Sequence, residues 1–335
     1  MPQNHTLVIV NPNAGSADAL AEMRERLEQV PGVTFCETQE PGDARRLAEQ
    51  AIADNIHTVI AAGGDGTINE VVNGLSQNFN AARLGILPLG TGNDFGRSIY
   101  LSDDRQEMLS TLIRAYTRPL DVVRMTAADG SVRHFLNASG GGFSAQLSRD
   151  LHDSNIKKLL GSLSYVVQGA ASLPQMETYH AEITLDDSET LNVDLANLVV
   201  SNGRFIGGGL FAAPKAMLDD GLLHLLIVPA MPVTTILSHF TMLMDGSHVD
   251  SEDLIVREAR RIVIRSQPPM PYNADGELMP EGDYTFEVLP GALHVIVDEH
   301  AQAVQPLKPS VEEKLPPEVI GTTPPEEYPE TGSGF

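Results

Sequence analysis

The feature that most constrains the fold is a cluster of glycines around one aspartate in the first quarter of the chain. Residues 59–62 are apolar and small or branched, and the segment Gly63–Thr67 (Gly-Gly-Asp-Gly-Thr) follows them directly. From Ile68 to Leu75 the apolar residues then recur at helical spacing. This order predicts a buried strand, a tight turn and the first turn of a helix.

Such a turn suits the binding of a phosphate. Glycines let the backbone approach a ligand closely, and the unpaired N–H groups at the start of a helix attract an anion. Asp65 would repel a phosphate unless a divalent cation lay between them. We therefore interpret the turn as a site for a nucleotide with Mg²⁺, with an ordinary glycine-containing connection as the alternative.

Strands and helices alternate through the first 120 residues. We expect strands at 7–10, 33–36, 57–62 and 84–87, with helices capped by Ser16 and Asp43 and a third after the glycine turn. Polar loops follow the first, third and fourth strands, and the carboxyl ends of parallel strands meet at one edge of a sheet. The pattern predicts a doubly wound parallel sheet over residues 1–120, with its ligand at that edge.

The second half of the chain has the pattern of antiparallel β-structure. Asp129-Gly130 separates two strand-like runs and predicts a hairpin. Further strands are expected at 178–185, 191–195, 222–228, 262–266, 284–289 and 293–297, and helices at 144–152, 163–173 and 233–244, the last with an apolar stripe that we assign to the core. We expect a β-sandwich domain over residues 121–305. The Pro- and Glu-rich segment 306–335 is predicted to be a disordered acidic tail.

Composition narrows the classes of function. The formal net charge of −23 argues against nucleic acid as a partner. No apolar run approaches the roughly 20 residues of a membrane span, and the first residues lack the pattern of a signal peptide. A single cysteine points to a reducing compartment. We expect a cytoplasmic protein.

In the order and spacing of its motifs the chain resembles the diacylglycerol kinase catalytic family, the bacterial lipid kinases related to sphingosine kinases. The resemblance spans about residues 7–297, and its motifs are Asn11–Gly15, Gly63–Thr67, Leu87–Phe95, Gly207–Gly209, Pro214–Leu222 and Asp275–Glu277. It implies an N-terminal domain like those of NAD kinases and diacylglycerol kinases, followed by a β-sandwich domain. It also implies transfer of phosphate from ATP to a lipid hydroxyl in the cleft between them, with diacylglycerol as the leading acceptor and phosphatidate as product.

The resemblance also implies roles for individual residues. Asp65 would organise the catalytic Mg²⁺, and Glu277 would be the general base for the lipid hydroxyl. The implied nucleotide-binding residues are Asn11, Pro12, Asn13, Ala14, Gly15, Thr38, Gly64, Asp65, Gly66, Thr67, Ile68, Asn69, Glu70 and Thr91. A structural Mg²⁺ would be held by Asp220 and the carbonyls of Met217 and Leu222, with Asp94 and Asp121 in the same acidic network. Without the resemblance, Asp275-Gly276-Glu277 is typical of a hairpin tip.

Several alternatives stay open at this point. The acceptor could be a sphingoid base, phosphatidylglycerol, undecaprenol or a soluble molecule as in NAD kinases, because pocket shape is not encoded in motifs. A non-catalytic regulator that binds nucleotide or lipid is a further alternative. A lipid acceptor would require transient peripheral contact at the inner membrane face, for which apolar residues around 205–211 are candidates. A homodimer is also open.

Overall fold

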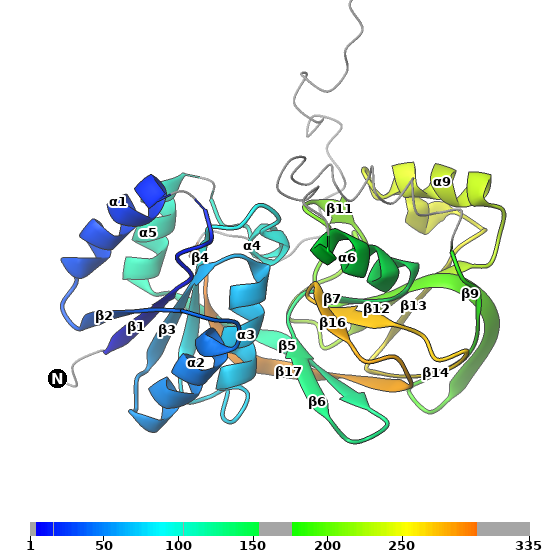
Figure 1. The fold of residues 1–335 in the computed structure, drawn as a ribbon, viewed down its shortest axis with the longest axis horizontal. Coiled ribbons are helices and arrows are strands. Elements are labelled where there is room, and N and C mark those ends of the chain that lie inside the picture. Colours follow the sequence, from blue (N-terminus) through cyan, green and yellow to red (C-terminus); the bar gives the residue numbers. More distant parts are fainter. Residues whose placement is uncertain (1–4, 16, 103, 154–175, 300–335) are drawn as a thin grey trace, which may run out of the picture.

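The computed structural model describes residues 5–15, 17–102, 104–153 and 176–299, and it has the predicted fold class, an α/β part followed by an antiparallel β-sandwich (Figure 1). The predicted cap at Ser16, the predicted helix at 163–173 and the predicted tail at 306–335 lie outside these residues. 

The first part is built on a parallel sheet. Its strands are β1 (Thr6–Val10), β2 (Val33–Glu37), β3 (Thr58–Gly63) and β4 (Arg83–Pro88), and they lie in the order β2-β1-β3-β4. Its helices are α1 (Ala17–Glu28), α2 (Asp43–Ala53), α3 (Asp65–Leu75), α4 (Asp94–Ser98) and α5 (Arg105–Arg114).

Helices cover both faces of this sheet, as a doubly wound fold requires (Figure 1). Leu7 and Ile9 of β1 pack into the cluster that contains the buried residues of α2 and α3. Val8 and Val10 point to the other face, into the cluster with residues of α1 and α5. Successive residues of a strand point to opposite faces, so the apolar run of β1 is buried on both sides.

The cap predicted for the second helix is wrong. Helix α2 begins at Asp43, and the N-cap position is occupied by Gly42 without a side-chain bond. The Asp43 carboxylate instead accepts from the backbone N–H of Gln39 at 2.8 Å. The N–H groups of Gly42 and Ala44 donate to the Glu70 carboxylate of α3 at 3.0 and 3.1 Å. A carboxylate from a neighbouring helix therefore satisfies the start of α2.

Helices α2 and α3 cross at a glycine, and this predicts a measurable loss of stability. A Cβ on Gly74 would lie against the carbonyl oxygen of Arg45 and 2.7 Å from the Cβ of Ala48. We expect Gly74→Ala to lower the free energy of unfolding by about 1–3 kcal/mol, because overpacking forces the helices apart. Urea unfolding measures this. Gly66→Ala on the same helix, where a Cβ meets nothing within 4 Å, is the control, and equal stability of both variants would contradict the close crossing.

The second part consists mainly of antiparallel strands. They are β5 (Thr117–Ala127), β6 (Val132–Phe135), β7 (Ala138–Gly142), β8 (Tyr179–Leu185), β9 (Glu189–Ser201), β12 (Leu223–Pro229), β13 (Ile255–Ala259), β14 (Arg261–Gln267), β15 (Tyr272–Ala274), β16 (Glu277–Met279) and β17 (Tyr284–Ile296). A short hairpin, β10 (Phe205–Ile206) with β11 (Leu210–Phe211), and helices α6 (Phe143–Asp153), α9 (Val233–Met242) and η2 (Ser247–Asp250) complete it. The hairpin predicted around Asp129-Gly130 is confirmed as β5–β6.

One long strand replaces the two predicted at 284–289 and 293–297. Strand β17 pairs with β5 on both sides of an irregularity between Leu289 and Leu293, so the backbone ladder continues past it. Its last part also lies parallel to β4, through Val295 opposite Leu84. Strands β5 and β17 thus run from the sandwich into the parallel sheet (Figure 1). The predicted division between residues 120 and 121 falls within β5 and stays a prediction.

Candidate active site

Three loops meet at the carboxyl ends of β1, β3 and β4. The Asn11 side chain donates to the Thr67 hydroxyl at 3.2 Å, which joins the first loop to the glycine turn. A Cβ on Gly90 would lie 2.7 Å from the Cα of Gly64. A side chain at position 90 would prevent this approach of the two backbones, so the packing of the loops requires glycine there.

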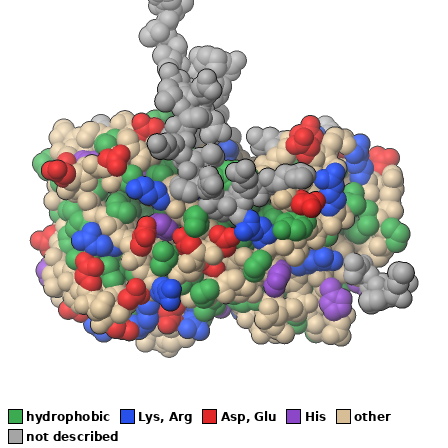
Figure 2. Space-filling model, turned by 180° about the vertical axis from the view of Figure 1, so that it is seen from behind, with side chains coloured by type: hydrophobic (Ala, Val, Ile, Leu, Met, Phe, Trp, Pro, Cys, Tyr) green, Lys and Arg blue, Asp and Glu red, His purple; other side chains and the backbone are tan. Residues whose placement is uncertain are grey.

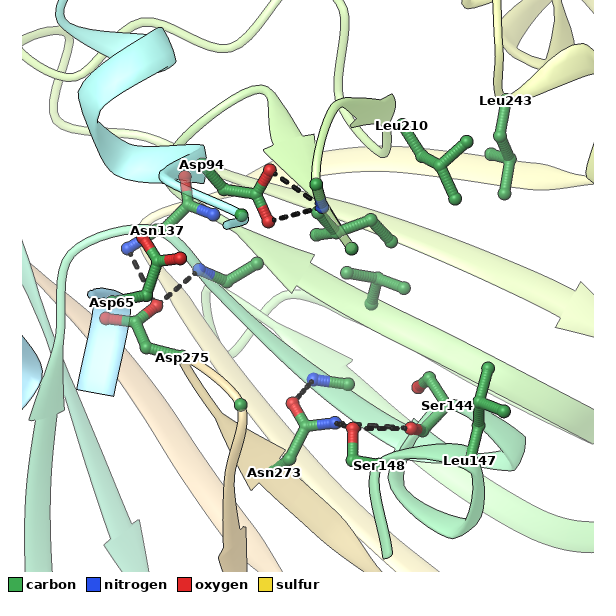
Figure 3. A pocket seen from close by; sticks show the side chains of 18 of the residues that line it. Asp65, Asp94, Asn137, Ser144, Leu147, Ser148, Leu210, Leu243, Asn273 and Asp275 are labelled. Atoms are coloured by element: carbon green, nitrogen blue, oxygen red, sulfur yellow. Dashed lines mark hydrogen bonds between the residues drawn. The ribbon is translucent and has the colours of Figure 1, made fainter. Parts of the chain in front are cut away.

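A cavity of about 710 Å³ opens beside the glycine turn and extends into the sandwich (Figure 3). The predicted site residues in its wall are Gly64, Asp65, Gly66, Ile68, Thr91, Asp94 and Glu277. Asp65 and Glu277, which lie far apart in the sequence, therefore share one cavity. The two residues must share a cavity if Asp65 is to organise a metal and Glu277 is to act as general base in one reaction.

The other predicted nucleotide-binding residues lie outside the cavity wall as the described residues define it. Residues 11–15 form the first loop, which Asn11 joins to Thr67 of the glycine turn. The N–H of Thr38 donates to the Val10 carbonyl at the end of β1 at 2.8 Å. These positions border the same sheet edge. The Glu70 carboxylate is bonded to the start of α2, and the Asn69 side chain is bonded to Asp275 at the hairpin tip, so protein groups already occupy both side chains. Their assignment to the nucleotide site stays a prediction.

Two carboxylates face each other at the end of the cavity beside the glycine turn. A Cβ on Gly92 would lie 2.9 Å from Oδ2 of Asp65 and 3.9 Å from Oδ2 of Asp94. Both oxygens of Asp94 accept from the backbone N–H of Gly208, at 3.0 and 2.9 Å. Burial, reinforced by the charge of Asp65, raises the pKa of Asp94 to about 6. A divalent cation would relieve this repulsion, and carboxylate oxygens suit Mg²⁺.

A second acidic pair consists of Asp121 of β5 and Asp220 of the loop predicted to hold a structural Mg²⁺. Asp121 is buried and accepts from the N–H groups of Gly221 and Gly291, each at 2.7 Å. Burial raises the pKa of Asp220 to about 6, and the charge of Asp121 adds to this. The predicted ligands Met217 and Leu222 belong to the same loop. Asp121 therefore neighbours Asp220, whereas Asp94 neighbours Asp65.

A metal ion at either acidic pair would need ligands beyond the two carboxylates. Within the described ranges, no group of three or more His, Cys, Asp or Glu side chains is placed to bind one. Mg²⁺ commonly takes only one or two protein carboxylates and completes its shell with water and substrate phosphates. The pair of Asp65 and Asp94 beside the glycine turn fits this mode, and the loop of Asp220 could add main-chain carbonyls.

Residues 275–277 form the tip of the β15–β16 hairpin, and this tip lies in the cavity wall. The positive φ angles of Asp275 (46°) and Gly276 (85°) are those of a two-residue hairpin turn. The Asp275 carboxylate accepts from four donors at 3.0–3.1 Å: Asn69 Nδ2 and the backbone N–H groups of Leu136, Asn137 and Ala138. The motif therefore forms a hairpin tip, and the same tip also lines the cavity.

Glu277 lies at the start of β16 with about one third of its side chain exposed, and it forms an ion pair with Arg133 of β6. Burial raises the pKa of Glu277. The Arg133 guanidinium acts in the opposite direction, and the charges of Glu70 and Asp275 add to the rise. The result is a carboxylate with a higher proton affinity than one in water, which is what a general base needs.

Away from the carboxylates the cavity is lined by apolar side chains, several of which are labelled in Figure 3. They are Phe143, Leu147, Met176, Val199, Ile206, Leu210, Leu226, Val228, Ile236, Leu243 and Leu254. The stripe of α9 that we assigned to the core thus also lines the cavity. The segment 205–211, predicted as a membrane contact, forms β10–β11 and supplies two of these side chains, Ile206 and Leu210. We call this apolar part of the cavity the apolar arm. It could not be predicted from the sequence, because apolar residues that line a cavity have the same pattern as core residues.

Two polar side chains in this part of the wall, Asn273 and His239, are bonded within the protein, whereas the buried Ser144 hydroxyl has no bonded partner among the described residues. Asn273 donates to the Ser148 hydroxyl at 2.9 Å and accepts from the N–H of Gly140 at 3.1 Å (Figure 3). His239 lies between the Thr235 carbonyl and the Ser251 hydroxyl, each at 2.8 Å. Buried polar groups that are already bonded leave the apolar surface as the main attraction for a ligand.

The exterior carries charges of both signs. Figure 2 shows acidic and basic side chains interspersed over the described part of one face. Among the described helices, none is long and apolar enough to cross a membrane.

The chain is similar to known proteins in both sequence and fold. Residues 5–125 match the family model of the diacylglycerol kinase catalytic domain, and residues 139–297 match that of the YegS C-terminal NAD kinase beta sandwich-like domain. A diacylglycerol kinase of Bacillus subtilis (strain 168) is 32% identical over 81% of this chain and 88% of its own. A protein of Xanthomonas euvesicatoria named "Probable lipid kinase YegS-like" is 33% identical, over 88% and 96%. A crystal structure described as a diacylglycerol kinase from Bacillus anthracis str. Sterne has a TM-score of 0.74 at 25% identity, covering 89% and 99%.

Proposed function

This chain belongs to the diacylglycerol kinase catalytic family, and we propose that it transfers the γ-phosphate of ATP to the free hydroxyl of diacylglycerol, forming phosphatidate. The observation that carries the proposal is the composition of one cavity. A glycine turn at a helix start lies at one end with two carboxylates, a carboxylate with a raised pKa lies in the wall, and an apolar arm continues beyond them. Each part corresponds to one requirement of the reaction.

The nucleotide would lie at the edge of the parallel sheet. Backbone N–H groups at the start of α3 would bind its phosphates. Asp65 and Asp94 would hold Mg²⁺ together with phosphate oxygens, and the bound ion would neutralise charge on the transferred group. We further propose that Asp220, with the carbonyls of Met217 and Leu222, holds a structural Mg²⁺ beside Asp121.

Glu277 would accept the proton of the attacking hydroxyl. The acceptor oxygen forms a bond to the γ-phosphorus while the bond from that phosphorus to the bridging oxygen of ADP breaks. The hydroxyl proton passes to the Glu277 carboxylate. A free alcohol is far too weak an acid to lose its proton at neutral pH, so a positioned base contributes directly to the rate.

The apolar arm would bind the acyl chains of the acceptor. The carboxylates of the cavity wall are Asp65, Asp94, Asp275 and Glu277. The first three lie together at the end beside the glycine turn (Figure 3), and Glu277 belongs to the same hairpin tip as Asp275. Within the described wall, the arm therefore offers no acidic partner for the ammonium group of a sphingoid base. A buried charge without a partner is costly, and this favours neutral diacylglycerol.

The acceptor resides in a bilayer, so we also propose transient contact with the inner face of the cytoplasmic membrane. Leu278 in the cavity wall is 41% exposed, and the β10–β11 hairpin lies in the same wall. Apolar side chains at the rim of a lipid-binding cavity can enter the interface as a peripheral protein does.

The assay that tests the proposal uses the purified full-length chain with γ-labelled ATP, Mg²⁺ and micelles that each contain one acceptor. We expect label in phosphatidate and much less in phosphorylated sphingosine, phosphatidylglycerol or undecaprenol. NAD serves as the soluble acceptor. Label in NADP but in none of the lipids would refute the lipid acceptor.

Filling the apolar arm should discriminate against long acyl chains. Val199 is buried and lines the arm from β9. We expect Val199→Phe to raise KM for dioleoylglycerol about tenfold or more, because a pocket discriminates by roughly 1–3 kcal/mol per methylene-sized change. KM for ATP should stay unchanged. The comparison is dihexanoylglycerol, whose short chains need less of the arm; an equal rise for both lipids would contradict an acyl-chain site.

A further inference from the structure

Arg133 is a largely buried cation in the hairpin β5–β6, and it connects two segments that contribute to the cavity. Its side chain is 17% exposed. Its Nη2 donates to the Asn69 side-chain oxygen at 2.7 Å and forms the ion pair with Oε2 of Glu277. A guanidinium presents its donors in a rigid plane, so two acceptors fixed at once define its orientation.

Asn69 anchors this arrangement on α3. It lies four residues after Asp65, one helical turn further along the same face. Its side-chain oxygen accepts from Arg133 and from Asn73 Nδ2 at 3.1 Å, and its amide donates to the His134 carbonyl and to Asp275, each at 3.1 Å. These four bonds use the full capacity of an amide side chain. The helix that begins at Asp65 is therefore bonded to the hairpin tip that carries Glu277.

We propose that Arg133 and Asn69 are positioning residues for the transfer reaction. Asn69 holds Arg133 in place, and Arg133 holds Glu277 in the cavity wall as a carboxylate, with Oε1 left to receive the proton. This inference rests on the proposed function, because it requires Glu277 as the proton acceptor.

The charges around Glu277 give the direction of the effect. Arg133 faces it from β6, Glu70 from α3 and Asp275 from its own turn. Burial and the two acids raise the pKa of Glu277, and Arg133 alone in this set lowers it. Without the guanidinium the pKa would rise further. A larger share of Glu277 would then be protonated near neutral pH and unable to act as a base.

The test is the pH dependence of kcat for the full-length chain. The rate falls as pH drops through the pKa of the base, so Arg133→Met should move this acidic limb upward by about one unit or more. At a pH on the acidic limb of the unaltered chain, kcat should fall about tenfold, and it should recover as the pH is raised above the shifted limb. Arg133→Gln, which keeps a donor without the charge, should behave similarly. Arg133→Lys, which keeps the charge, should restore the limb to within about half a unit.

Two further variants complete the design. Asn69→Ala should shift the limb in the same direction. Arg124→Met is the matched control, because Arg124 lies on the paired strand of the same hairpin and forms a similar ion pair with Glu287 at 2.7 Å, outside the cavity; its profile should equal that of the unaltered chain.

Two results separate failure of this inference from failure of the proposed function. In the first, Arg133→Met and Arg133→Gln fold and keep the acidic limb of the unaltered chain, while Glu277→Gln is inactive. That result overturns the positioning role of Arg133 but keeps Glu277 as the base. Full activity of Glu277→Gln removes the base assignment and this inference with it. Circular dichroism of each variant establishes that the fold is intact.

Discussion

Replacing Glu277 by glutamine should lower kcat about a hundred- to ten-thousand-fold, the usual contribution of a positioned general base. Glutamine has nearly the same shape but cannot accept the proton of the attacking hydroxyl. KM for ATP should change little, because Glu277 lies on the hairpin tip and not in the loops of the parallel sheet. Steady-state phosphorylation of diacylglycerol in micelles measures both constants.

Two neighbouring variants make the result specific. Glu281→Gln removes an acid shortly after the same hairpin, where Glu281 pairs with Arg149 at 3.3 Å on the exposed surface. Its kcat should equal that of the unaltered chain. Glu277→Asp keeps the base but withdraws it by one methylene, and an intermediate kcat is expected. Full turnover by folded Glu277→Gln would eliminate Glu277 as the base.

The fold was predictable because its signals are local and strong. Few other structures are compatible with apolar strands that are buried on both faces and alternate with amphipathic helices. The glycine turn around one aspartate is equally restrictive. Strands β1 to β4 appear within two residues of their expected bounds. The shared cavity of Asp65 and Glu277 could be expected only from the resemblance, because spacing along the chain carries no information about contacts across two domains.

The network around Glu277 could not be predicted in the same way. Asn69 and Asn73 stand four apart on α3, a spacing that indicates a polar stripe on an otherwise apolar helix. Their partners lie on β6 and on the hairpin tip, far away in the sequence. Glu70 likewise satisfies the start of α2, a bond that no local motif indicates. The sequence predicts two strands at 284–289 and 293–297 because Pro290-Gly291 usually ends a strand. In the structure, pairing of β17 with β5 continues past these two residues.

Asp65→Asn should lower kcat in the presence of Mg²⁺ but should not weaken ATP binding in its absence. With Mg²⁺, kcat should fall about a hundred- to a thousandfold, the scale seen when one preorganised group that stabilises transition-state charge is removed. Without Mg²⁺, ATP should bind as tightly as before or more tightly, because a negative charge beside its phosphates is gone. Equilibrium binding of a fluorescent ATP analogue, titrated with and without the metal, measures the second effect.

This opposition distinguishes a metal-organising carboxylate from a structural one. A residue needed only for folding would weaken ATP binding in both conditions, whereas Asp65→Asn should weaken only the part that depends on Mg²⁺. Asp54→Asn, at the exposed end of α2, should change neither measurement. The repulsion between Asp65 and Asp94 predicts one more consequence: the pKa of Asp94 should fall in Asp65→Asn, because the neighbouring charge that helps to raise it is absent. A variant with unaltered kcat and an unaltered Mg²⁺ requirement would refute the role of Asp65.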